Sequence, residues 1–187
     1  MKKVFAIILI LFVLISINSC NYRETNITDT AKYGEFDDFE RIGGLAVFPE
    51  VIPEDAEVLY YLYYSATPAI SKTSYQICLN LKLTPEEYQK EAERISLIDK
   101  NTSIEGFKIT SDIRFNENDF IYPAYVSVFS LNSAFEYVLL NEAENNIIYI
   151  YIQFTNEKDI KFDKIFLPAG YKPYGAIKTG TVFTVYG

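Results

Sequence analysis

The chain has 187 residues, of which 49% are hydrophobic and 16% aromatic, and its formal net charge is −8. This acidity opposes nucleic-acid binding, which needs a basic surface, and it opposes recruitment to anionic lipid by charge. The chain contains no histidine, which excludes Ser-His-Asp and Cys-His catalysis and histidine-ligated metal centres.

The first nineteen residues have the layout of a secretory signal peptide. Lys2 and Lys3 give a positively charged start, and an unbroken run of twelve apolar residues follows from Val4 to Ile15. A helix that spans a bilayer needs about 20 apolar residues. The run therefore predicts a cleaved leader rather than a permanent membrane span.

The residues before Cys20 resemble the lipobox of bacterial lipoproteins. Ile17 supplies its aliphatic position and Ser19 its small residue, while Asn18 departs from the usual small residue. The resemblance covers residues 1–20 and implies cleavage between Ser19 and Cys20. It also implies a diacylglycerol on the Cys20 thiol and an acyl chain such as palmitate on the new amino group. Such lipid would hold the protein on the extracytoplasmic face of the cell membrane. The alternative is an ordinary signal peptide followed by an unmodified cysteine.

Removal of residues 1–19 leaves 168 residues with a net charge of −10, a length that suits one domain. Residues 20–34 are expected to form the lipidated cysteine and a flexible tether, because Asn21 to Gly34 is polar and lacks periodicity. Residues 35–187 are expected to form a single domain. With Cys20 lipidated, Cys78 has no partner for a disulfide.

Two strands are predicted in the first half of this domain. Val58 to Tyr64 is almost entirely apolar or aromatic, which predicts a strand buried on both faces. From Ser74 to Leu83 apolar and polar residues alternate, which predicts a half-buried strand. Gln76 and Cys78 would lie on its polar face. No neighbouring motif activates the Cys78 thiol, so we expect an inert cysteine.

The clearest helix signal begins at Thr84. Thr84 can cap the helix, Pro85 suits its first position and Glu87 completes a capping box. The helix is expected to reach about Ile98. Its buried stripe would contain Tyr88, Ala92, Ile95 and Ile98.

Several strands are predicted in the second half. Their ranges are Phe107–Thr110, Tyr122–Leu131, Phe135–Leu140, Ile147–Phe154 and Ala176–Tyr186. The polar turn Asn141–Asn145 favours antiparallel pairing of the strands that flank it. A short helix is expected over Asp159–Ile165. These elements predict an α+β domain, a twisted and mostly antiparallel sheet covered by one main helix at about 84–98.

Two polar segments are candidate metal sites. Asp99–Glu105 begins like a calcium loop, but Ile104 stands where glycine is needed and Thr110 where glutamate is needed. Asn116–Asp119 is similarly polar, and both segments are interpreted as turns. The sequence indicates no catalytic residue, cofactor or metal ligand. A hydrolase that uses two carboxylates stays open as an alternative, since it requires only two placed acidic residues.

Tyrosines are concentrated on two strands. They are Tyr60, Tyr61, Tyr63 and Tyr64 on one, and Tyr149 and Tyr151 on the other. Such rings fill a core, or they stack on sugars and anchor a protein partner. We expect a membrane-anchored envelope lipoprotein that acts by binding, with an envelope protein or glycan as partner and no nucleic acid. A structural or assembly subunit of an envelope complex is a further alternative.

Overall fold

The computed structural model describes residues 22–35, 45, 47–68, 72–98, 103–104, 107–108, 112–130, 134–173, 176–179 and 182–185. The strands are β1 (Arg23–Ile27), β2 (Glu57–Thr67), β3 (Ser74–Lys82), β4 (Ser103–Ile104), β5 (Phe107–Lys108), β6 (Asp112–Arg114), β7 (Ala124–Ser130), β8 (Ala134–Asn141), β9 (Asn146–Gln153), β10 (Ala176–Thr179) and β11 (Val182–Val185). The α-helix of this described part is α2 (Pro85–Ser96). Short 3-10 turns are η1 (Thr30–Lys32), η3 (Glu117–Asp119), η4 (Glu142–Glu144), η5 (Glu157–Asp159) and η6 (Lys164–Phe166).

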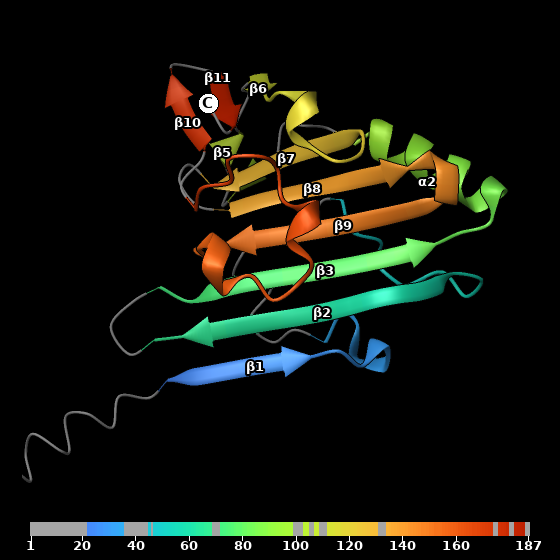
Figure 1. Ribbon diagram of the computed structural model, residues 1–187, viewed down its shortest axis with the longest axis horizontal. Helices are drawn as coiled ribbons and strands as arrows, with labels where there is room; N and C mark the ends of the chain where they lie inside the picture. Colours follow the sequence, from blue (N-terminus) through green and yellow to red (C-terminus); the bar gives the residue numbers. More distant parts are fainter. Residues whose placement is uncertain are drawn as a thin grey trace, which may run out of the picture.

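Six strands form one open sheet in the order β1-β2-β3-β9-β8-β7 (Figure 1). Every neighbouring pair in it is antiparallel. Two smaller sheets, β10-β11-β6 and β4-β5, accompany it. One main helix and an open antiparallel sheet make this an α+β fold, as the sequence predicts.

Both faces of the large sheet carry a hydrophobic core. On one face Tyr149 and Val138 pack with Tyr88 and Ile95 of α2. On the other face the alternate residues of the strands pack against residues 160–171, which include the buried Phe162. Figure 1 shows α2 behind the sheet and the turns η5 and η6 in front of it. The middle strands β8 and β9 are consequently buried on both sides.

The prediction of a half-buried strand at residues 74–83 is wrong for its middle, because the polar face of β3 is also covered there. Gln76 and Cys78 are both 0% exposed. The Gln76 side chain bonds to the covering backbone: its Nε2 donates to the Asp159 carbonyl at 3.0 Å, and its Oε1 accepts from Lys161 N at 2.8 Å. A glutamine that finds both partners can be buried at little cost. Alternation in sequence does not distinguish such a strand from one that faces water.

The expectation of a flexible tether over residues 20–34 also differs from the structure. Arg23–Ile27 forms β1, which pairs with the end of β2 from Arg23↔Thr67 to Ile27↔Tyr63. Tyr33 then returns to the domain, where its hydroxyl donates to the Pro49 carbonyl at 2.6 Å. Its ring meets Tyr61 edge-on at 5.7 Å between centroids. The domain therefore begins about twelve residues earlier than the sequence suggested.

The predicted start of α2 is confirmed. Thr84 is the N-cap, and its Oγ1 accepts from Glu87 N at 3.3 Å with Pro85 in the first turn. The stripe that faces the sheet is also as predicted, with Tyr88 and Ile95 buried and Ala92 and Ile98 packed beside them. The local capping signals were sufficient to place this element.

Two predictions near the C-terminus are wrong. Residues Asp159–Ile165 form no continuous helix, because η5 ends at Asp159 and η6 starts only at Lys164. Phe162 between them is 5% exposed and packs on the sheet, which favours an extended connection over a helix. The single strand expected over Ala176–Tyr186 is two paired strands, β10 and β11.

Some predicted features lie outside the described residues. They include Ser19, Cys20 and most of Asp99–Glu105, whereas Asn116–Asp119 is the turn η3 that was expected. Within the described ranges, no helix is both long and apolar enough to cross a membrane. The same ranges contain no group of three or more metal-ligating side chains.

Candidate binding groove

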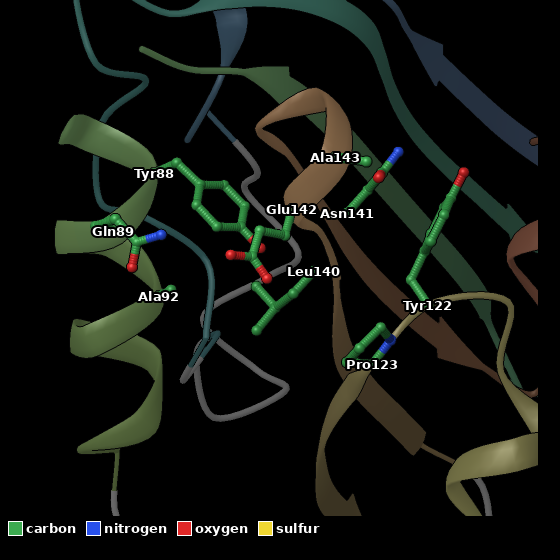
Figure 2. A pocket seen from close by; sticks show the side chains of 9 residues that line it. All are labelled: Tyr88, Gln89, Ala92, Tyr122, Pro123, Leu140, Asn141, Glu142 and Ala143. Carbon is green, nitrogen blue, oxygen red and sulfur yellow. The ribbon is translucent and has the colours of Figure 1, made fainter. Parts of the chain in front are cut away.

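A groove of about 490 Å³ lies between the first turns of α2 and the turn that connects β8 to β9 (Figure 2). The helix supplies one wall, η4 the second, and the residues before β7 the third. Its lining residues are Tyr88, Gln89, Ala92, Tyr122, Pro123, Leu140, Asn141, Glu142 and Ala143. The volume falls within the range of small-ligand sites in proteins.

Backbone hydrogen bonds hold the three walls together. Leu83 N, just before the helix, donates to the Asn145 carbonyl at 3.0 Å and so joins α2 to the β8–β9 turn. Asn145 closes that turn with a left-handed backbone at φ 52°, a conformation that asparagine tolerates better than most residues. Leu140 N donates to the Pro123 carbonyl at 2.9 Å, which joins the third wall. The groove is thus built on regular elements with short connections.

The groove has an apolar floor and a polar mouth. Tyr88 is 4% exposed and Leu140 is half-buried, while Gln89 and Glu142 are exposed. Burial raises the pKa of Tyr88, and the nearby Glu142 carboxylate raises it further. The tyrosine therefore keeps its neutral hydroxyl at neutral pH.

Glutamates dominate the surroundings of the groove. Those on η4 and the first turn of α2 are Glu142, Glu144, Glu86 and Glu87. The lysines nearest in sequence are Lys82 and Lys90, both exposed. An apolar floor surrounded by glutamates favours a ligand that has both an apolar part and a positive charge. Glu142 is the one carboxylate among the lining residues, so a mechanism with two carboxylates would need a second one from elsewhere.

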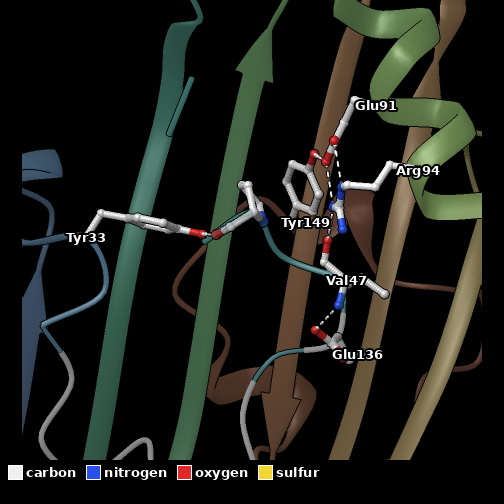
Figure 3. A network of polar contacts seen from close by, with 7 residues as sticks. Tyr33, Val47, Glu91, Arg94, Glu136 and Tyr149 are labelled. Atoms are coloured by element: carbon white, nitrogen blue, oxygen red, sulfur yellow. Dashed lines mark hydrogen bonds and ion pairs between the residues drawn. The ribbon is translucent and has the colours of Figure 1, made fainter. Parts of the chain in front are cut away.

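A polar network fixes α2 and residues 47–49 to the sheet (Figure 3). Arg94 pairs with Glu91 at 2.6 Å and donates to the Val47 carbonyl at 2.6 Å. The Tyr149 hydroxyl donates to the same Glu91 carboxylate at 2.5 Å, and Val47 N donates to the buried Glu136 at 3.0 Å. Burial is the largest cause that raises the pKa of Tyr149, with the Glu91 charge second. These bonds satisfy buried polar groups and position the helix that carries the groove.

The tyrosine-rich strands contribute to the core. Tyr61, Tyr63, Tyr149 and Tyr151 are at most 3% exposed and share one face of the sheet. Tyr60 is 37% exposed and donates to the Lys161 carbonyl at 3.3 Å. The groove tyrosines are instead Tyr88, predicted as a core residue, and Tyr122, predicted as the start of a strand. Nothing in the sequence marks either as a lining residue, because the groove forms from three separate elements.

Cys78 is a free cysteine, and it is fully buried although the sequence places it on the polar face of its strand. Burial raises the pKa of its thiol far above the usual value, and Asp163 adds to the effect. The thiol is therefore inert at neutral pH.

Comparison with protein-family models, with curated proteins and with solved structures finds no match to this chain. The groove is therefore interpreted from its own residues.

Proposed function

We propose that this protein is a lipid-anchored envelope protein whose domain binds a basic peptide segment of an envelope partner in the groove beside α2. The lipobox resemblance at Ile17, Ser19 and Cys20 supports the anchor. The groove supports a binding role. The observation that supports this role most directly is the Glu142 carboxylate at the opening of a groove with an apolar floor.

A lysine or arginine side chain matches this arrangement in two ways. Its methylene stem can pack on apolar surface while its charged end stays near water. In the groove the stem would lie against Leu140 and Tyr88, and the charge would meet Glu142. Gln89 and Asn141 add amide groups that can bond to a peptide backbone. An acidic ligand would be repelled by the same glutamates.

Peptide binding to the detergent-solubilised full-length protein tests this proposal. The probe is a fluorescent peptide of alternating lysine and leucine, and its counterpart has glutamate for lysine. The lysine peptide should bind, with an affinity that falls as salt is raised. Glu142→Gln should weaken binding about fivefold, the effect of losing one partly exposed ion pair.

The matched control is Glu157→Gln, an exposed glutamate on η5. This variant loses the same charge away from the groove and should bind the peptide as the wild type does. Equal binding of the two peptides, or equal weakening by the two variants, would contradict the proposed site.

A further inference from the structure

We infer that the anchored domain rests on an anionic bilayer surface through the corner of the sheet where β1 begins, and that it presents the groove away from the membrane. The inference rests on the proposed lipidation of Cys20. It concerns a second surface of the molecule, the membrane-facing corner, which consists of the start of β1, the end of β2, residues 72–76 and residues 156–161.

The first argument is the length of chain between the lipid and the fold. Three peptide units separate Cys20 from Arg23, and their maximum reach is about 10 Å. Arg23 is already paired with Thr67 in the sheet. The membrane-facing corner therefore cannot move far from the bilayer while β1 stays paired.

The second argument is the position of the groove in the same sheet. β1 starts where β2 ends, whereas the groove residues Leu140 and Asn141 end β8 at the opposite end. β8 is also four strands away from β1 in the sheet order. With strands about 4.8 Å apart and a rise of about 3.4 Å per residue, the diagonal between them is roughly 30 Å. Figure 1 shows the start of β1 and the helix α2 at opposite corners.

The third argument is the difference in charge between the membrane-facing corner and the end of the sheet that holds the groove. The basic residues of the membrane-facing corner are Arg23, Lys72, Lys158 and Lys161, and its acidic residues are Glu24, Glu157 and Asp159. Two of these lysines are placed by ring contacts: Lys72 Nζ lies 4.6 Å from the Phe154 ring centroid, and Lys161 Nζ lies 5.1 Å from that of Tyr64. The groove end has the four glutamates named above and Glu57, which begins β2, against the exposed lysines Lys82 and Lys90. Anionic headgroups would repel the groove end far more strongly than the corner.

Tyr22 adds a fourth observation. It immediately precedes β1 and is 59% exposed. Tyrosine is enriched at membrane–water interfaces, where its ring packs at the level of the headgroups. An exposed tyrosine two residues after the lipidated position fits that environment.

Fluorescence quenching on vesicles tests the orientation. The full-length lipidated protein is reconstituted into phosphatidylethanolamine and phosphatidylglycerol vesicles that contain headgroup nitroxide lipid. Asn156→Cys and Gln89→Cys replace exposed neutral residues at the corner and at the groove. Each introduced thiol can be labelled selectively, because Cys78 is fully buried. Quenching should be at least about threefold stronger for Asn156→Cys, because the headgroup layer is only about 5–8 Å deep.

A variant with a longer linker tests whether the short chain between Cys20 and β1 causes the orientation. Insertion of a ten-residue Gly-Ser segment between Asn21 and Tyr22 should reduce the quenching of the Asn156→Cys probe. Equal quenching at the two positions, or no effect of the linker, would overturn the orientation while leaving the anchor intact. Protein that carries no lipid and does not bind the vesicles would overturn the anchor as well.

Discussion

Gln76 shows how one side chain allows a second layer to cover the sheet. It is fully buried, and it bonds to a carbonyl and an amide of the covering segment. Without those bonds, the Asp159 carbonyl and the Lys161 amide would face an apolar strand. The glutamine thus supplies polar partners at a position where a hydrophobic residue would leave two backbone groups unsatisfied.

Gln76→Leu should therefore destabilise the domain in spite of its added hydrophobicity. Two backbone groups lose their partners, so the free energy of unfolding should fall by about 2 kcal/mol. Urea denaturation measures the change. Gln89→Leu, the same substitution at an exposed site, should alter stability by less than about 0.5 kcal/mol. A Gln76→Leu protein as stable as the wild type would refute this role.

Thr84 is a second residue whose contribution to the stability of the domain can be measured by itself. Its hydroxyl caps α2 through Glu87 N, so Thr84→Ala should lower the free energy of unfolding by about 1 kcal/mol. Thr84→Ser keeps the hydroxyl and should retain most of that energy. Thermal or urea unfolding measures the stability of both variants. Equal stability of the alanine and serine variants would contradict the capping role of the hydroxyl.

Among the elements, those with strong local signals could be predicted from sequence. The start of α2 is encoded by Thr84, Pro85 and Glu87 within four residues. Strands β8 and β9 were expected because apolar, β-branched runs flank a polar turn. Each of these signals lies within a short window, so no knowledge of distant contacts was needed.

The remaining elements depend on partners far away in the chain. The β1 segment Arg23–Ile27 contains a single apolar residue, Ile27, and its pairing with β2 spans roughly forty residues of sequence. The connection around Phe162 is determined by the sheet face that this ring covers. The groove has the same limitation, because its walls come from α2, η4 and the start of β7. Local sequence patterns contain no information about contacts between elements that are distant in the chain.

Hydrogen exchange tests whether β1 is a strand or a tether. Amides of residues 23–27 that bond to β2 should exchange more slowly than in an unstructured peptide, while a tether would exchange freely. Ile27→Asp should remove this protection, because Ile27 packs against the core beneath the sheet. Asn26→Asp, at the exposed neighbouring position, should preserve it. Exchange at unstructured rates throughout residues 23–27 of the wild type would contradict the strand.

At the scale of the whole molecule, the core is unusually rich in ionisable hydroxyls. Tyr149, Tyr151 and Tyr171 are buried, and burial is the largest cause that raises the pKa of each. Unfolded tyrosine ionises near pH 10. Above that pH the unfolded chain releases protons that the folded chain retains. Stability is therefore fully present below about pH 9 and falls as pH rises through the unfolded value.

This linkage predicts loss of stability in alkali. The free energy of unfolding should fall above about pH 10 by up to about 1.4 kcal/mol per pH unit for each buried tyrosine. Urea denaturation at pH 8 and at pH 10.5 measures the slope. Tyr149→Phe should make the slope shallower, because it removes one buried hydroxyl. Stability that does not fall between these pH values would contradict the burial of neutral tyrosines.

The proposed lipid at Cys20 determines both the proposed location of the domain and its proposed orientation. Metabolic labelling with an alkyne analogue of palmitate tests it directly in a bacterium that expresses the protein. Wild type and Cys78→Ala should be labelled and recovered in the membrane fraction, while Cys20→Ala should be unlabelled. Equal labelling of Cys20→Ala and wild type would contradict the anchor.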